Sequence, residues 1–301
     1  MSGKVLVLLS TYNGSRFLRE QLETIFAQRD VEAFVVARDD GSTDSTCAIL
    51  DEFAQRGNLS WQAGTNAGPA RSYFKLLDSA PYAEYYAFAD QDDHWDTDKL
   101  LTAIQSLRQV EAGRPALYWC KTRPVNEELV PLRIPVCAVP EVDIQRALLR
   151  NFASGCTMVF NRSLLEAVKD APFSDATMHD SWMFKVCLAL GGAVVYDPVP
   201  HLSYRQHASN VVGSHQDIRG RANRWLRYVV SRKRTREREA GALLARYGTQ
   251  MDTRDREFAT LVSTYRNSFT TRMKLISQPA VWSAGPLVGL ATLGAVVTSS
   301  L

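Results

Sequence analysis

Three groups of polar residues in this chain are of types that bind metals or move protons, and the first is acidic. Asp90-Gln91-Asp92-Asp93 places three carboxylates within four residues. Adjacent like charges raise one another's pKa unless a cation shares them. A hard divalent ion such as Mg²⁺ or Mn²⁺ binds one or two carboxylates together with phosphate oxygens and water. The tetrapeptide therefore predicts a Mg²⁺ or Mn²⁺ site; the alternative is a solvated acidic turn before a helix.

The other two groups lie later in the chain. Asp180, in Met178-His179-Asp180-Ser181-Trp182, precedes an amphipathic run, and the helix dipole favours an acidic residue there, so Asp180 is a candidate cap. His207 follows Tyr204-Arg205-Gln206 and is either a metal ligand, since neutral imidazole binds divalent ions, or a polar loop residue.

The first 110 residues alternate short apolar runs with amphipathic segments. The predicted strands are Val5–Leu9, Ala33–Ala37, Leu59–Gln62 and Tyr85–Ala89, and the predicted helices cover 18–26, 47–53, 69–77 and, after an Asp96 cap, 100–107. This order predicts an α/β fold with an open, mostly parallel sheet and helices on both faces.

Polar residues directly follow three of these strands. They are Thr11-Tyr12-Asn13, Asp39-Asp40 and the acidic tetrapeptide. Ligands of such sheets bind at the carboxyl ends of the strands, so these residues predict the site. Neither the dinucleotide-binding glycine fingerprint nor a P-loop is present, so a metal is expected to neutralise the phosphates of any nucleotide.

These motifs resemble, in order and spacing, those of family 2 glycosyltransferases. The resemblance rests on Ser10-Thr11-Tyr12-Asn13, Arg38-Asp39-Asp40-Gly41-Ser42-Thr43-Asp44 and Ala89-Asp90-Gln91-Asp92-Asp93-His94-Trp95, and covers residues 4–213. Together with Tyr204-Arg205-Gln206-His207, the acidic motif is most similar to the rhamnosyltransferase branch. The resemblance implies an inverting, metal-dependent enzyme with the Rossmann-like GT-A fold.

The resemblance also implies roles for individual residues. In the nucleotide-sugar site, Thr11 and Asp40 would hold the base beside Asp39, Asp90 would lie by the ribose, and Gln91 and Arg71 would complete the contacts. Asp92 and His207 would bind the metal. Asp180 would be the base, with His179 where many members have Glu. Arg71 is alternatively a surface residue in the first turn of a helix.

The implied reaction is a single displacement in which the base deprotonates the acceptor as its oxygen attacks the anomeric carbon. We expect transfer of one L-rhamnose from dTDP-β-L-rhamnose, giving an α-L-rhamnoside, to a lipid-linked or glycan acceptor in cell-surface polysaccharide assembly. Three alternatives remain open. They are a UDP-hexose donor, a nucleotidyltransferase, and a sugar-nucleotide-binding scaffold without catalysis.

Composition divides the chain into two parts. The 301 residues are 46% hydrophobic and 22% charged, as in an ordinary globular protein. Residues 216–275 contain 15 Lys and Arg against 6 Asp and Glu, whereas 1–215 are net acidic. We therefore predict a catalytic domain over 1–215 and a basic helical extension over 216–301. Five scattered cysteines and no signal-peptide pattern favour a cytoplasmic protein with reduced thiols.

The extension has two features that favour a membrane surface. From Asp217 to Lys274 the pattern is helical, and basic residues surround an apolar, aromatic face, which is typical of a helix on anionic lipid. Residues 276–301 carry no charge, and the core Ala280–Val297 predicts a re-entrant or shallow anchor at the cytoplasmic face. A docking helix or an oligomer contact is the alternative. No nucleic-acid-binding motif accompanies the charge.

Overall fold

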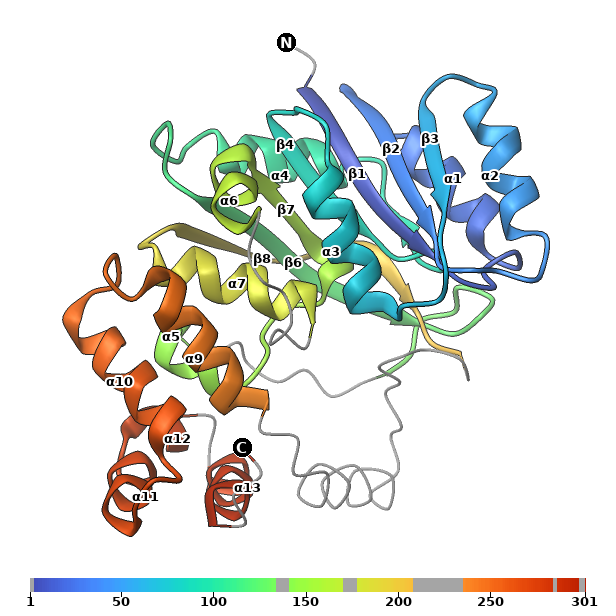
Figure 1. The fold of residues 1–301 in the computed structure, drawn as a ribbon. Coiled ribbons are helices and arrows are strands. Elements are labelled where there is room, and N and C mark those ends of the chain that lie inside the picture. The colour runs from blue at the N-terminus through green and yellow to red at the C-terminus, as the bar shows by residue number, and fades with distance from the viewer. Residues whose placement is uncertain (1–2, 134–140, 170–177, 208–234, 284–285, 298–300) are drawn as a thin grey trace.

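The computed structural model describes residues 3–133, 141–169, 178–207, 235–283, 286–297 and 301. The described strands form one sheet in the order β3-β2-β1-β4-β7-β6-β8-β5, with helices on both faces and a helical group at one end (Figure 1). The strands are β1 (Gly3–Thr11), β2 (Val31–Asp39), β3 (Leu59–Ala63), β4 (Tyr85–Ala89), β5 (His94–Trp95), β6 (Ala116–Val125), β7 (Met158–Asn161) and β8 (Ala193–Arg205). The helices are α1 (Leu18–Phe26), α2 (Thr46–Ala54), α3 (Pro69–Ser79), α4 (Lys99–Leu107), α5 (Ile144–Leu149), α6 (Arg162–Val168), α7 (His179–Ala189), α9 (Thr235–Tyr247), α10 (Thr253–Thr264), α11 (Phe269–Ile276), α12 (Pro279–Trp282) and α13 (Pro286–Val297).

The parallel half of the sheet confirms the predicted α/β class. Strands β1 to β4 are the four predicted strands, and they pair in parallel. Thr11 at the end of β1 is in register with Asp39 at the end of β2, and Leu9 with Ala89 at the end of β4. The polar residues that follow these strands therefore lie at one edge of the sheet.

The other half of the sheet adds antiparallel pairs. Strand β7 lies antiparallel to both β4 and β6, and β8 runs parallel to β6. The short β5 follows the acidic tetrapeptide directly and pairs antiparallel with β8, His94 opposite Ser203. This pairing brings the residues after β8 beside the acidic tetrapeptide.

Alternate residues of β1 enter two separate cores. Val5, Val7 and Leu9 pack with α1, α2 and α4 on one face. Leu6 and Leu8 pack on the other face with α3, α5, α6 and α7. Side chains of a strand alternate between faces, so an apolar run such as Val5–Leu9 is buried only when both faces are covered.

The predicted Asp96 cap is wrong. Helix α4 begins at Lys99, and Asp98 occupies the position before it. The Asp96 carboxylate instead binds the Arg123 guanidinium through two hydrogen bonds, at 2.9 and 3.1 Å. A paired, charge-assisted contact of this kind is stronger than a single cap hydrogen bond. The Asp96 side chain therefore binds Arg123 of β6 and does not cap α4.

The extension packs on the same core as α7. Buried residues of α9 to α11, among them Leu243, Phe258 and Leu275, belong to one hydrophobic cluster with α3 and α7. Figure 1 shows α9 beside α5 and α7, with α11 to α13 farther from the sheet. The predicted boundary at 215/216 and the basic run 219–234 lie outside the described residues.

The uncharged C-terminal stretch is divided into two short helices. The predicted Ala280–Val297 segment forms α12 and α13, and Gly289 of α13 lies against the Trp282 ring. A Cβ at Gly289 would come within 2.3 Å of that ring, so only glycine permits this approach. Within the described residues, no helix has both the length and the apolar character needed to cross a membrane.

Candidate active site

The loops after β1 and β2 are joined by a buried hydrogen-bond network around Asp39. The carboxylate of Asp39 accepts hydrogen bonds from the Thr11 hydroxyl at 3.0 Å and from the Ser42 hydroxyl at 2.5 Å. The backbone N–H groups of Gly41 and Ser42 donate to its other oxygen. Burial alone would raise the pKa of Asp39, but the hydrogen bonds from Ser42, Thr11 and Gly41 outweigh it and lower the pKa. Asp39 is thus an ionised, rigidly held group.

Asp40 connects the same edge to the loop before α3. Its carboxylate forms a buried ion pair with Arg38 and accepts hydrogen bonds from the N–H groups of Ala67 and Gly68 at 2.8–3.0 Å. The backbone of Gly68 has a φ of 82°, which glycine adopts without strain. Asp40 therefore shapes the loop that leads to Arg71, and Arg71 itself is exposed in the first turn of α3.

Gln91 links the β1 and β4 loops. Its side-chain oxygen accepts from the Tyr12 N–H at 2.9 Å, and its amide donates to the Tyr12 carbonyl at 3.0 Å. Gly14 allows this contact, because a Cβ there would come within 2.1 Å of the Gln91 oxygen. The two backbone bonds hold the Asp90–Asp93 segment against the end of β1.

The acidic tetrapeptide contains two carboxyls with raised pKa values. Burial and the neighbouring Asp92 raise the pKa of Asp90 to about 7, and Asp180 adds to this effect. Burial, Asp90 and Asp92 raise the pKa of Asp93 well above its ordinary value. These shifts are those expected of a carboxylate cluster that a cation would stabilise.

Asp92 and His207, the two residues expected to bind a metal, lie side by side. His207 Nε2 lies 2.6 Å from Asp92 Oδ2, and the His207 ring packs on Phe17 with centroids 5.3 Å apart. Arg205 donates from Nε to the Asp92 carbonyl at 2.9 Å. Both side chains are mostly buried, at 9% exposure for His207 and 16% for Asp92. The carboxylate suits Mg²⁺ or Mn²⁺, and a neutral imidazole also binds divalent ions, so the pair could hold such an ion with phosphate oxygens in the remaining positions.

A second set of ligand-type atoms lies deeper, in Asp90, Asp93 and Cys156, all within 4.8 Å of one another. Burial raises the pKa of the Cys156 thiol well above its ordinary value, so it stays protonated, and a thiol suits neither Mg²⁺ nor Mn²⁺. The buried Lys99 ammonium adds a positive charge nearby, 3.6 Å from the centre of the Trp95 ring. Asp92 and His207 therefore fit a divalent cation better than this deeper set.

Asp180 lies in the first turn of α7 and is only 6% exposed. Its carboxylate accepts hydrogen bonds from the N–H groups of Ser181 at 2.6 Å and Gly155 at 3.2 Å. Gly155 belongs to a 3₁₀ turn between α5 and β7. Asp180 thus occupies a first-turn position, which the helix dipole favours, and its charge acts on Asp90. The geometry is compatible with both roles considered for it.

His179 is an aromatic core residue beside Asp180. Its ring stacks on Tyr73 with centroids 3.8 Å apart and meets the edge of Phe88 at 4.6 Å. Neither ring nitrogen has a hydrogen-bond partner among the described residues. Burial lowers the pKa of His179 to about 4, so the ring is neutral at pH 7.

Two residues of this edge were missed as site residues. From sequence, Tyr73 is only one residue of the helix predicted over 69–77, yet its hydroxyl lies 3.0 Å from Asp90 Oδ1. Arg205 was noted only as part of a motif, yet it holds the Asp92 backbone. No local signal distinguishes Tyr73 from Phe74, its buried neighbour, so only the fold identifies it.

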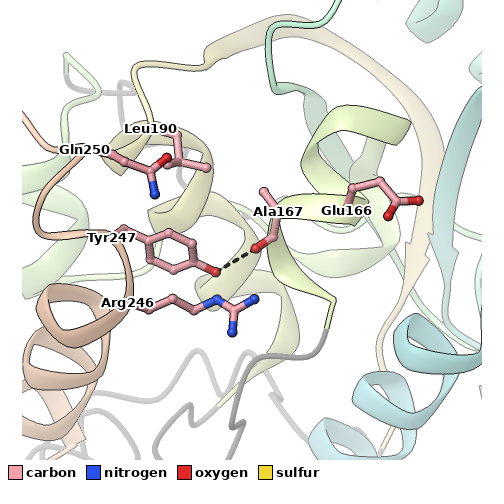
Figure 2. Close-up of a pocket in the computed structure, with 6 residues that line it drawn as sticks. All are labelled: Glu166, Ala167, Leu190, Arg246, Tyr247 and Gln250. Carbon is pink, nitrogen blue, oxygen red and sulfur yellow. Dashed lines mark hydrogen bonds between the residues drawn. The ribbon is translucent and has the colours of Figure 1, made fainter.

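A separate hollow lies at the C-terminal end of α7, between α6 and α9 (Figure 2). It is lined by Glu166, Ala167, Leu190, Arg246, Tyr247 and Gln250, and the Tyr247 hydroxyl donates to the Ala167 carbonyl there at 2.9 Å. It contains none of the predicted site residues, so the candidate active site remains the sheet edge.

Comparison with solved structures gives the same fold. The chain superposes on Staphylococcus aureus TarS 1–349 in complex with UDP-GlcNAc with a TM-score of 0.59, covering 99% of this chain and 89% of that one at 18% identity. For the mannosyltransferase PcManGT from Pyrobaculum calidifontis, in complex with GDP-Man and Mn²⁺, the TM-score is 0.56 at 19% identity, with 99% and 87% covered. These similarities confirm the predicted GT-A fold with a helical C-terminal region.

Sequence comparison identifies the family. The dTDP-rhamnosyl transferase RfbG of Shigella flexneri is 26% identical over 248 residues, 74% of this chain and 82% of RfbG. The succinoglycan biosynthesis protein ExoW of Rhizobium meliloti is 28% identical over 197 residues, 59% of this chain and 61% of ExoW. The family model "Glycosyl transferase family 2" matches residues 6–169, which include the three strand-end motifs. The chain therefore belongs to glycosyl transferase family 2.

Proposed function

We propose that this glycosyltransferase is a metal-dependent, inverting rhamnosyltransferase that transfers one L-rhamnose from dTDP-β-L-rhamnose to a lipid-linked or glycan acceptor in cell-surface polysaccharide assembly. The observation that carries the mechanism is the arrangement around Asp90. The Asp92–His207 pair adjoins it, and the charge of Asp180 acts on it. This arrangement supports a donor site and a base at one edge of the sheet.

In the proposed reaction, Asp180 accepts the proton of the acceptor hydroxyl as that oxygen forms a bond to the anomeric carbon. The bond from that carbon to the diphosphate oxygen breaks, and the nucleoside diphosphate leaves with the electron pair. A base opposite the leaving group produces inversion. Asp92 and His207 would hold a divalent cation, which neutralises charge on a diphosphate when bound. Thr11, Asp39 and Asp40 would fix the loops that receive the nucleobase of the donor.

RfbG supports the rhamnose donor, because it is a dTDP-rhamnosyl transferase and matches most of this chain. TarS, which binds UDP-GlcNAc, supports a UDP-hexose as the alternative. Calorimetry with dTDP-rhamnose, UDP-GlcNAc and GDP-mannose, each with and without Mn²⁺, distinguishes them. Tighter, metal-dependent binding of dTDP-rhamnose is expected. Tighter binding of UDP-GlcNAc would identify a UDP-hexose as the donor in place of dTDP-rhamnose. If none of the three nucleotide-sugars binds in a metal-dependent way, the proposal is refuted.

The metal assignment predicts that Asp92→Ala and His207→Ala each weaken Mn²⁺ binding by about 100-fold or more. Loss of a residue that merely supports a ligand already costs 10- to 100-fold, so loss of a ligand costs at least the upper figure. Titration of Mn²⁺ by electron paramagnetic resonance, without nucleotide, measures this directly. His94→Ala removes a half-exposed imidazole from the same region and serves as the matched control. Unchanged Mn²⁺ affinity in both variants would show that neither Asp92 nor His207 is a metal ligand.

We further propose that the extension contacts an anionic membrane surface on the cytoplasmic side. Among the side chains that the structure describes in α11 to α13, five large apolar ones are 39–75% exposed, namely Phe269, Met273, Trp282, Leu290 and Val297. The basic residues Arg272 and Lys274 belong to α11, the helix that also carries Phe269 and Met273. Apolar side chains with adjacent cations suit the headgroup region of anionic lipid.

Trp282→Glu and Leu290→Glu are each expected to weaken binding to phosphatidylglycerol-containing vesicles by about tenfold, the effect of removing one buried apolar side chain. Vesicle cosedimentation at fixed salt measures the affinity. Tyr82→Glu, in an exposed loop between α3 and β4, is the control and should bind like the unaltered chain. Equal binding by all three variants would contradict the assignment.

A further inference from the structure

A buried ion pair joins the extension to the helix that carries Asp180. Lys185 Nζ of α7 lies 2.5 Å from Glu239 Oε2 of α9, and their side chains are 1% and 0% exposed. Figure 1 shows α9 beside α7. Arg236 approaches the same carboxylate at 3.6 Å. Burial lowers the pKa of Lys185 to about 8, although Glu239 opposes the shift, so the ammonium form predominates at pH 7.

The ion pair continues into the first turn of α7. Lys185 Nζ donates a hydrogen bond to the Ser181 hydroxyl at 2.8 Å, and the Ser181 N–H donates to Asp180 Oδ1 at 2.6 Å. Asp180 is also among the charges that favour the protonated form of Lys185. The contacts therefore run without a break from Glu239 through Lys185 and Ser181 to Asp180.

Stability does not account for this arrangement. Buried ion pairs lose much of their Coulomb energy to desolvation, and well-packed apolar replacements of both partners are often as stable or more so. Apolar contacts of Leu243 and Tyr247 already attach α9 to the core. A buried pair that connects an attached helix to a candidate base is better explained by the orientation it imposes.

We propose that Lys185 and Glu239 are positioning residues, through which the C-terminal extension fixes the first turn of α7 and the orientation of the Asp180 carboxylate. This inference rests on the proposed role of Asp180 as the base. It makes the extension part of the catalytic apparatus, because Glu239 supplies the distal end of the contacts. Loss of Glu239 alone would leave the buried Lys185 ammonium without its ion pair, and loss of Lys185 alone would take the nearer of two cations from Glu239. Either single change is expected to destabilise the protein strongly, so neither tests the proposal.

The test is the double variant Lys185→Met with Glu239→Leu, which keeps volume and removes both charges. We expect a melting temperature within about 4 °C of the unaltered chain and unchanged donor KM. We expect kcat to fall by about 10- to 100-fold, the effect of a displaced catalytic group. Ser181→Ala removes the hydrogen bond from Lys185 to the Ser181 hydroxyl, while it keeps the hydrogen bond from the Ser181 N–H to Asp180 and the ion pair with the extension, and it should give a similar loss. Unchanged kcat in the folded double variant would overturn the proposal.

Two further variants separate the possible failures. Tyr247→Phe removes the hydrogen bond to Ala167, another contact of α9 with the body, and should leave kcat unchanged (Figure 2). If Tyr247→Phe lowers kcat as much as the double variant does, then any weakening of the contact between α9 and the body lowers kcat. That result would overturn the specific positioning role of Lys185 and Glu239. Asp180→Asn tests the base itself. If it retains full activity, the proposed function fails; if it alone loses activity, only the positioning role fails.

Discussion

Replacing Asp180 with asparagine is expected to lower kcat by about 10²–10⁴-fold, the usual contribution of a general base. Asparagine cannot accept the acceptor's proton at neutral pH. It keeps one side-chain oxygen, which can accept the shorter hydrogen bond, from the Ser181 N–H at 2.6 Å, and it gives up only the longer one, from the Gly155 N–H at 3.2 Å to the other carboxylate oxygen. The loss should therefore appear in the chemical step and not in folding.

Donor affinity should survive this change. The loops around Asp39 and Asp40 are held by their own hydrogen bonds and none of these involves Asp180. Product formation at saturating donor and acceptor gives kcat, and calorimetry with the nucleotide gives the dissociation constant. Glu166→Gln, a half-exposed carboxylate in the hollow of Figure 2, is the matched control and should keep full activity. A kcat of Asp180→Asn within tenfold of the unaltered chain would assign Asp180 to helix capping.

The parallel half of the sheet could be predicted from sequence because its signals are local. The runs Val5–Leu9 and Tyr85–Ala89 are buried on both faces and end directly in polar residues. The antiparallel pairs of β7 and the pairing of β5 with β8 could not be predicted, because they join segments far apart in the chain. The pairing of β5 with β8 brings His207 beside Asp92. From the sequence, only the family resemblance suggested that these two residues belong to one site.

The contacts around α7 were hidden for the same reason. The sequence predicts an amphipathic run after Asp180, yet nearly every residue of α7 is buried. Lys185 and Glu239 have the composition of surface charges, and they are 54 residues apart. Only the packing of α9 on α7 shows that the two charges are partners. The division of the chain by composition therefore understates how closely the extension joins the catalytic body.

His179 predicts a distinct pH dependence of stability. Its pKa is about 4 in the folded protein and 6.5 in the unfolded chain, because burial excludes the charged form. A group whose pKa is depressed on folding stabilises the fold above its unfolded value, and this stability is lost as pH falls through the folded value. Between pH 8 and pH 5 the expected loss from His179 is about 2 kcal/mol. The groups that face the ring are Tyr73 from α3, Phe88 from β4 and Asp180 from its own helix.

The variant His179→Phe keeps an aromatic ring between Tyr73 and Phe88 and removes the titration. Urea unfolding at pH 8, 6.5 and 5 should show the unaltered chain losing about 2 kcal/mol more stability than the variant over this range. Phe184→Leu, another buried aromatic of α7, is the control, because it should lower stability equally at each pH. Absolute stabilities are less informative, since phenylalanine also changes the packing against Gly155.

If the free energy of unfolding changes with pH in the same way for the unaltered chain and for His179→Phe, the His179 ring gains a proton without leaving its place. In that case Asp180, the nearest carboxylate on the same helix, would have to stabilise the protonated His179 ring. Stacking of the neutral His179 ring on Tyr73 would then not be the contact that holds α7 against the sheet edge.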